Sequence, residues 1–389
     1  MSYTAKLIRI TTVPVSLKTL LKGQHRFMSE NGYEVVGVSS EGKALNEVQE
    51  NEGVRVVALE MTRTISLIKD FKALWGFYRL CKKEKPLMVH SHTPKAGIVG
   101  MLGAKLAGVP IRLHTVAGLP LMEATGFKRK VLNFVERLTY SCANMVYPNS
   151  KGLYDFILSN RFTTKEKLKV IANGSSNGID TRFFDPQQIS LEQQNQLKDE
   201  LNISDSDFVF VFVGRLVKDK GINELVSVFS NLKGDNAKLL LVGPFEETLD
   251  PLLPETKKEI HSNGNVLSVG WQSDVRPYLS IADALVFPSY REGFPNVVMQ
   301  AGAMGLPSIV TDINGCNEII IDNENGVIIP PKNEKRLYDA MRFFLENPND
   351  VERMASNSRN LIVDRYEQRV VWDALLKEYR RLEKELLRS

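Results

Sequence analysis

Apolar runs of strand length alternate with segments of helical period along most of the chain. In the first half the runs predict strands at residues 6–12, 34–39, 54–59, 88–91, 111–115, 145–148 and 168–172. Apolar residues at helical spacing predict helices at residues 16–31, 66–83, 97–107, 128–143 and 150–158. Continuous β-branched runs that alternate with helices are typical of parallel strands buried on both faces. The pattern therefore predicts an α/β fold with a doubly wound sheet.

The second half repeats this alternation from its own first strand at residues 208–213. Further strands are predicted at 238–242, 265–269, 284–288, 308–311 and 326–329, and helices at 222–232, 275–280 and 296–304. Residues 185–205, rich in Gln, Asn and Ser, are the best linker candidate. We expect a domain over residues 1–185 and another over residues 186–369. An active site would lie between them, at the carboxyl ends of strands.

Composition excludes several classes of protein. The chain is 43% hydrophobic, which is ordinary for a soluble protein. Its 389 residues are too many for one hydrophobic core. Three scattered cysteines (Cys81, Cys142 and Cys316) cannot form a disulfide framework, so we expect a reducing cytoplasm. We expect no signal peptide, because residues 10–17 contain Thr, Pro and Ser, and no membrane span, because Lys105 and glycines interrupt residues 96–109.

The net charge of +4 conceals a division of charge between the halves. Residues 1–185 carry 27 Lys and Arg against 15 Asp and Glu, whereas residues 186–389 carry 23 against 31. A basic half suggests that this half meets an anionic surface or ligand. Nucleic acid would fit the charge, but no recognition motif accompanies it, so we expect no nucleic acid partner.

The turn after strand 208–213 combines glycines with cations in the sequence GRLVKDKG, residues 214–221. Gly214 would let a phosphate approach the backbone, the following helix start favours an anion, and Arg215 and Lys220 would neutralise it. An ordinary turn with solvated basic residues is the alternative, and a short motif alone leaves both open.

A second motif follows strand 284–288, with the sequence SYREGFPNVVMQA at residues 289–301. Pro295 suits the first turn of a helix, and the free amides of Asn296 and Val297 would point into the same cleft. Glu292 stands just before that helix, and Gln300 lies inside it. A carboxylate beside a phosphate-binding helix end is unfavourable unless it binds hydroxyl groups, which sugars supply.

The two motifs resemble those of the retaining nucleotide-sugar glycosyltransferases of the GT-B fold, family four. The resemblance includes PS before EGFPN and AGAMGLPSIVTD after it, and the order of segments 240–246, 269–271 and 282–296. Residues 173–183 resemble the hinge of that family. Segments 11–24, 89–100 and 112–119 resemble a subgroup that builds bacterial capsule and O-antigen polysaccharides. The resemblance implies two Rossmann-like domains facing across a cleft, with the C-terminal helix 370–389 crossing back to the first domain.

The resemblance also implies roles for matching residues. Arg215 and Lys220 would hold the donor diphosphate, and Glu292 would bind hydroxyls of the transferred sugar. Gln300 replaces a second glutamate that binds the ribose, and an amide loses the charge-assisted part of that bond. Backbone near Trp271 would meet the base. The remaining donor-binding candidates belong to the same motifs: Gly214, Gly293, Phe294, Pro295, Asn296 and Val297.

The first half offers fewer candidates. Many relatives have a histidine just after the strand predicted at 111–115, where this chain has Ala117 and Gly118. We take His92, at a strand end, as a catalytic candidate, and Lys95, His114 and Gly118 as candidates for binding the acceptor or its phosphate. A histidine packed in the core is the alternative for each, and for His114 it is equally good.

Two further features bear on partners. Residues 119–142 set Lys128, Arg129 and Lys130 beside apolar residues, and such a segment can dock on anionic headgroups. A core helix with a solvated basic end is the alternative. Asp205-Ser206-Asp207 fits a metal-binding DxD pattern, but it lies in the predicted linker, where Asp and Ser are ordinary turn residues. We therefore expect no required metal and no other cofactor.

Together these observations predict a cytoplasmic retaining glycosyltransferase, peripheral on the inner face of the plasma membrane. It would move a sugar from a UDP-sugar to a polyprenyl-diphosphate-linked saccharide during capsule or O-antigen assembly. Two alternatives remain at this point. A nucleotide-sugar epimerase shares the architecture, and a non-catalytic nucleotide-sugar-binding scaffold would explain Gln300 and Ala117 together.

Overall fold

The computed structural model describes residues 5–62, 66–122, 124–232, 236–248 and 250–388. Its internal contacts divide the chain into unit 1, Met1–Gly178 with Gln368–Ser389, and unit 2, Ile179–Glu367. Each unit carries a six-stranded parallel sheet flanked by helices, which confirms the predicted pair of Rossmann-like α/β domains. Ser389, the last residue of the predicted terminal helix, lies outside the described residues.

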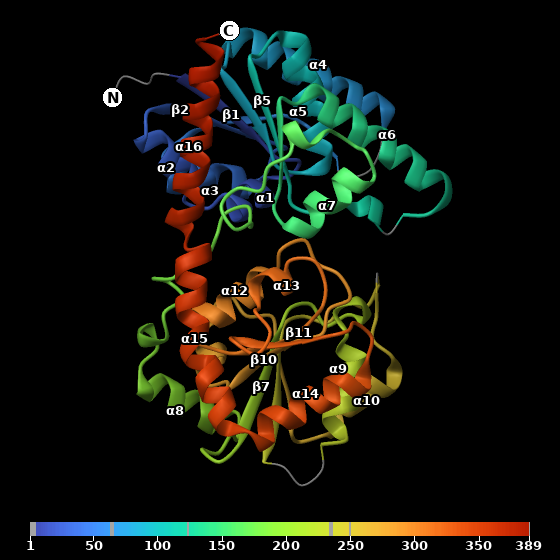
Figure 1. The fold of residues 1–389 in the computed structure, drawn as a ribbon, viewed down its shortest axis with the longest axis vertical. Helices are drawn as coiled ribbons and strands as arrows, with labels where there is room; N and C mark the ends of the chain where they lie inside the picture. The colour runs from blue at the N-terminus through green and yellow to red at the C-terminus, as the bar shows by residue number, and fades with distance from the viewer. Residues whose placement is uncertain (1–4, 63–65, 123, 233–235, 249, 389) are drawn as a thin grey trace. The chain divides into compact units, whose positions relative to one another are not determined.

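Unit 1 has the strand order β3-β2-β1-β4-β5-β6. Its strands are β1 Ala5–Ile10, β2 Tyr33–Ser39, β3 Arg55–Ala58, β4 Met88–Ser91, β5 Ile111–Val116 and β6 Met145–Pro148. Its helices are α1 Pro14–Leu20, α2 Gln24–Glu30, α3 Lys43–Glu52, α4 Leu67–Glu84, α5 Pro94–Ala107, α6 Gly126–Cys142, α7 Lys151–Ser159 and α16 Gln368–Leu386, with short 3-10 turns at Pro120–Met122 and Lys165–Lys167. Helices α4 to α6 cover one side of the sheet, and α16 covers the other (Figure 1).

Unit 2 has the strand order β12-β11-β10-β7-β8-β9. Its strands are β7 Phe208–Val213, β8 Ala237–Val242, β9 Val266–Gly270, β10 Ala284–Phe287, β11 Ser308–Thr311 and β12 Gly326–Ile329. Its helices are α8 Leu191–Glu200, α9 Ile222–Ser230, α10 Pro254–Ser262, α11 Arg276–Ser280, α12 Asn296–Ala303, α13 Cys316–Ile319, α14 Glu334–Glu346 and α15 Pro348–Tyr366, with 3-10 turns at Pro186–Gln188 and Lys218–Lys220.

The strand order locates a ligand edge in each unit. The chain winds from β1 to β2 and β3, then returns to β4 on the other side of β1, and unit 2 reverses likewise between β7 and β10. Loops that follow the two strands at such a reversal leave a crevice at their carboxyl ends, where α/β sheets bind ligands. In unit 2 these loops carry the GRLVKDKG and EGFPN motifs.

Three local predictions differ from the structure. Residues 168–172 form no strand, because only Leu168 makes an isolated bridge to Val146. The helix predicted at 16–31 breaks into α1 and α2 at Gly23, whose φ of 79° leaves the helical region. The stretch 185–205, suggested as a linker, contains α8 and lies inside unit 2. Ser190 and Gln193 form a capping box at the start of α8. Some of the polar residues that suggested a linker therefore begin a helix instead.

Among the described residues, no helix is both long and apolar enough to span a bilayer.

Candidate active site

Glycines bring the turns of unit 2 close together at the carboxyl edge of its sheet. A Cβ on Gly243, after β8, would lie 1.8 Å from the carbonyl oxygen of Gly214, after β7. A Cβ on Gly221 would lie 2.3 Å from the carbonyl oxygen of Pro288, after β10, and Gly221 has a φ of 70°. Only glycine fits such contacts and such a left-handed backbone. The second glycine of the GRLVKDKG motif therefore joins the two loops of the crevice.

The two sequence motifs meet through an ion pair. The Lys220 ammonium bonds the Glu292 carboxylate, although the residues are 72 apart in sequence, and each side chain is only 17% exposed. The Ser289 hydroxyl donates to the same carboxylate at 3.1 Å. The Lys220 ammonium also lies 5.7 Å from the centroid of the Phe287 ring. The structure therefore places a cation and a carboxylate side by side at the crevice of unit 2.

Further bonds hold the loop around Glu292 in place. Arg291 pairs with Asp219 at 2.6 Å, and the Tyr290 amide donates to the Asp219 carbonyl at 2.9 Å. From the next strand along, the Asn314 side chain donates to the Glu292 carbonyl at 3.2 Å. Sequence reasoning missed these contacts. The Asn-Gly pair after β11 is a turn signal, but it does not reveal which backbone the asparagine holds.

The start of α12 offers unpaired amides at this crevice. Pro295 is the N-cap, one position before the first-turn place that the sequence predicts. Asn296, Val297 and Val298 are the first three helical residues, whose N–H groups have no partner within the helix. Phe294 is buried edge-on against Tyr366, with ring centroids 5.4 Å apart. Together with the partial positive charge of a helix start, these amides can receive an anion.

The other donor-binding candidates share this edge of the sheet. Arg215 is exposed directly after Gly214, and no carboxylate within the described residues pairs with it. Gln300 is half-buried in the second turn of α12. Trp271 follows β9, is 70% exposed, and is separated from Arg215 by β8. Gly293 lies in the loop held by Asn314. The structure thus joins Lys220 to Glu292 and places the remaining candidates on the segments that follow β7, β9 and β10.

In unit 1, His92 lies just past β4 and is 3% exposed. Neither of its ring nitrogens has a hydrogen-bond partner among the described residues, and the same holds for Asn149 Oδ1 and Ser176 Oγ. These three residues line a pocket of about 20 Å³. Burial, followed by the nearby His90 and Arg9, lowers the pKa of His92 well below its usual value. His92 is therefore a neutral hydrogen-bonding group and a poor proton acceptor.

A buried polar network lies behind His92. Arg9 is fully buried, bonds the side chain of Gln24, and lies 3.4 Å from the Tyr379 hydroxyl. His90 contacts that hydroxyl at 2.6 Å through Nδ1 and the Thr115 hydroxyl at 2.8 Å through Nε2. Tyr379 belongs to α16, so the network fixes the C-terminal helix on the sheet of unit 1. Arg9 lies within the apolar run that predicts the first strand, but that run does not show which groups the guanidinium contacts.

The remaining candidates of unit 1 lie elsewhere. His114 lies on the side of the sheet opposite to His90, and its Nδ1 is 2.8 Å from the Ser91 hydroxyl. Burial lowers the pKa of His114 to about 4. Lys95 pairs with Asp70 at 2.5 Å, so a carboxylate already neutralises its charge. Gly118 has open space where a Cβ would stand.

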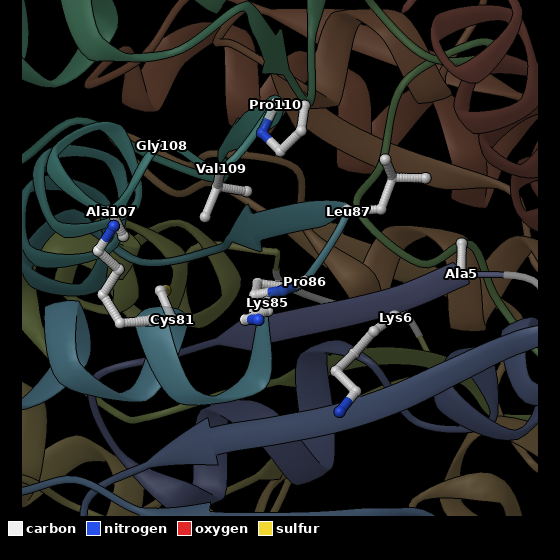
Figure 2. A pocket seen from close by; sticks show the side chains of 11 residues that line it. Ala5, Lys6, Cys81, Lys85, Pro86, Leu87, Ala107, Gly108, Val109 and Pro110 are labelled. Carbon is white, nitrogen blue, oxygen red and sulfur yellow. The ribbon is translucent and has the colours of Figure 1, made fainter. Parts of the chain in front are cut away.

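A pocket of about 570 Å³ lies at the opposite edge of the unit 1 sheet (Figure 2). It is lined by the start of β1 and the segments before β4 and β5, including Lys6, Lys85 and Pro110. Lys6 is already paired there with Glu84 at 2.7 Å. Because parallel sheets bind ligands at their carboxyl ends, this larger pocket is not our candidate site. Nowhere in the described ranges do three His, Cys, Asp or Glu side chains gather in a metal-binding group.

Comparison with known proteins agrees with this architecture. Residues 193–361 match the family model of glycosyl transferases group 1, and residues 24–174 match that of the glycosyl transferase 4-like domain. The chain is 32% identical over 382 residues to the capsular polysaccharide biosynthesis glycosyltransferase CapM of Staphylococcus aureus, covering 98% of both chains. It is 28% identical to the UDP-Gal:alpha-D-GlcNAc-diphosphoundecaprenol alpha-1,3-galactosyltransferase of Escherichia coli, covering 92% of this chain and 93% of that one.

The fold also matches a solved structure. The crystal structure of Anabaena Alr3699/HepE in complex with UDP aligns with a TM-score of 0.80 at 16% identity. The alignment covers 97% of this chain and 99% of that one. At this identity the likeness establishes the fold alone.

Proposed function

The chain belongs to the glycosyl transferases of group 1, and we propose that it is a retaining enzyme that moves a sugar from a UDP-sugar to a saccharide carried on polyprenyl diphosphate. It is a glycosyltransferase of the capsule and O-antigen type, so neither the epimerase nor the scaffold alternative is carried further. The observation that carries the proposal is the ion pair between Lys220 and Glu292 beside the free amides of α12.

The donor would bind at the crevice of unit 2. Arg215, Lys220 and the amides of Asn296 and Val297 supply positive charge for a diphosphate, and Glu292 supplies acceptor oxygens for sugar hydroxyls. As the bond between sugar and diphosphate breaks, negative charge grows on the leaving diphosphate, and fixed cations and amides stabilise it. The leaving oxygen would help to take the proton of the incoming hydroxyl on the same face of the sugar, which retains the configuration.

The acceptor would bind unit 1. The unpaired polar atoms of His92, Asn149 and Ser176 surround a space that holds one water-sized group, and an acceptor hydroxyl is of that size. Because His92 is held neutral, we assign it to positioning this hydroxyl rather than to removing its proton. Lys95 could contact a phosphate only by releasing Asp70. The Escherichia coli relative is named for UDP-Gal and for an acceptor on diphosphoundecaprenol, which supports both substrate classes here.

A lipid-linked acceptor also implies work at a membrane. Unit 1 carries 32 Lys and Arg against 17 Asp and Glu, so the basic excess is larger in the folded unit than in the first half of the sequence. We propose a peripheral enzyme on the inner face of the plasma membrane, with an anionic lipid surface as a partner of unit 1 and no required metal.

Two measurements test the proposal. Thermal unfolding with UDP-, GDP- and dTDP-sugars should show stabilisation by a UDP-sugar, about 2.7 kcal/mol at a hundredfold excess over Kd. Transfer to a synthetic diphosphate-linked saccharide should then give a product whose anomeric configuration, read by NMR, is that of the donor. Stabilisation only by another nucleotide sugar would refute the UDP assignment, and an inverted product would refute retention.

A further inference from the structure

Helix α4 presents an apolar and basic face that nothing in the described structure covers. Leu67 is 84% exposed, Trp75 is 50% exposed, and Ile68 and Phe71 lie between these values. Their spacing along α4 places them on neighbouring positions of one side, opposite the buried Phe77. Large apolar side chains scattered singly on a surface are normal, but four on successive turns of one helix form a patch.

Helix α6 presents a second face of the same kind. Phe127 is 81% exposed and Phe134 is 67% exposed. Lys130 and Arg137 are also exposed, and the spacing of 3, 4 and 3 residues puts all four on one side of the helix. Sequence reasoning expected a basic amphipathic segment here, but it did not expect one on α4.

The two helices belong to one layer of unit 1. Both pack against α5, in which seven of the fourteen residues are buried, among them Gly97, Gly100 and Gly103. Figure 1 shows α4, α5 and α6 side by side on the same side of the first sheet. We call the exposed side chains of α4 and α6 the α4–α6 face; its large apolar members are Leu67, Ile68, Phe71, Trp75, Phe127 and Phe134.

The charges of this face have one sign. The acidic residues of the two helices are Asp70, Glu84 and Glu136. Asp70 pairs with Lys95, and the Glu84 side chain is 8% exposed and paired with Lys6 and Arg55. Glu136 is buried, and burial raises its pKa to about 7. The exposed charges that α4 and α6 themselves carry are therefore all positive; the exposed Glu60, just before α4, lines a pocket with Lys69 and Lys72 at one margin of the face.

We infer that the α4–α6 face is the surface on which the enzyme docks to a lipid bilayer that contains anionic headgroups. Aromatic and aliphatic side chains enter the boundary between headgroups and acyl chains, while Lys and Arg beside them meet the phosphates. A second copy of this chain is disfavoured as the occupant, because two faces of the same positive sign repel. The inference rests on the proposed lipid-linked acceptor for its purpose, but docking is measurable without any turnover.

The experiment is sedimentation of the full chain with vesicles of phosphatidylcholine alone or mixed with phosphatidylglycerol. The parent protein should sediment with the mixed vesicles and remain in solution with the neutral ones. The double variant Phe71→Ser and Trp75→Ser should lose roughly tenfold or more of its partition coefficient, since two large apolar side chains no longer insert. Lys128→Ser with Lys130→Ser should reduce binding and also weaken its dependence on salt.

Leu191→Ser is the matched control, because Leu191 is 75% exposed on α8 of the acidic unit 2 and should not affect sedimentation. All changed residues are exposed, so thermal unfolding should match that of the parent. Equal binding to neutral and anionic vesicles, or binding to neither, would overturn the inference; the second result would indicate an acidic protein partner. If only the Lys128→Ser and Lys130→Ser variant lost vesicle binding, α4 would not be part of the docking surface. Stabilisation by UDP-sugars is read separately, so failure of docking and failure of the proposed function are distinguishable.

Discussion

Lys220→Ala tests the core of the proposed site, because this side chain joins the two motifs of unit 2. In the parent structure its ammonium bonds the Glu292 carboxylate, and both side chains are 17% exposed. The substitution removes the cation nearest to Glu292. It leaves the backbone of the turn intact, since the close approach to Pro288 is made by Gly221.

Two magnitudes follow from this geometry. If Lys220 stabilises charge on the leaving diphosphate, its loss should cost about 2.7–4 kcal/mol in the transition state, or about 10²–10³ in kcat. The stability cost is smaller. The burial of this ion pair is intermediate between that of an exposed pair and that of a fully buried one. We therefore expect the free energy of unfolding to fall by about 1–2 kcal/mol. That corresponds to a decrease in Tm of only several degrees, about 2–4 °C per kcal/mol for a unit of 150–250 residues.

The assay is the initial rate of transfer from the UDP-sugar at saturating acceptor, with Tm measured on the same preparations. Lys218→Ala is the control, because Lys218 is an exposed lysine of the same 3-10 turn, and no carboxylate in the described part of the chain pairs with it. The control should keep the parent's rate and Tm. A Lys220→Ala variant that turns over within roughly threefold of the parent would refute the role given to Lys220.

Three further changes are expected to have defined effects. Glu292→Gln keeps the shape of the side chain but removes its charge, so kcat should fall about tenfold to hundredfold, and Tm should fall by no more than in Lys220→Ala, because the same ion pair is lost; an unchanged rate of sugar transfer would contradict its role. Arg215→Ala removes an exposed cation, so the stabilisation by UDP-sugar in thermal unfolding should shrink while the ligand-free Tm stays constant; equal stabilisation would show that Arg215 does not contact the donor. Glu136 is buried with a pKa raised to about 7, so the native state keeps a proton that the unfolded chain loses, and stability should fall as pH rises from about 4.5 to 7. Glu136→Gln should therefore raise Tm at pH 8 relative to the parent and change it little at pH 4.5; the reverse order would contradict the buried neutral carboxyl.

Local patterns were sufficient for the architecture. Runs such as β7 and β10 are apolar throughout, and their alternation with helices specifies parallel strands buried on both faces. Besides the one-turn α13, the helices that the pattern missed are α3, α8, α10, α14 and α15, and these carry polar residues over much of their surface. Their apolar stripes are narrow because only one side of each helix packs on the unit. Continuous apolar runs therefore do not reveal these helices.

For the candidate site, too, the sequence was sufficient for some features and not for others. Arg215, Lys220, Glu292 and Gln300 could be named as candidates from the sequence, because each lies in a short motif next to a strand or a helix start. No local signal could pair Lys220 with Glu292, assign Asn314 to the Glu292 carbonyl, or bury Arg9 beneath α16. These contacts join residues that lie from 22 to 370 positions apart in the chain. They depend on strand order and on close approaches at glycines, which a linear pattern does not contain.

Sequence and tertiary structure determined different features of this protein. The sequence by itself determined the two α/β domains, the motifs after β7 and β10, and a basic excess in the first half. Only the tertiary structure buried Arg9 beneath α16, paired Lys220 with Glu292, and exposed the apolar side of α4. The physical reason is that apolar periodicity reports how much of a segment is buried, whereas the folded chain alone decides which neighbour buries it and which side chains stay in contact with water.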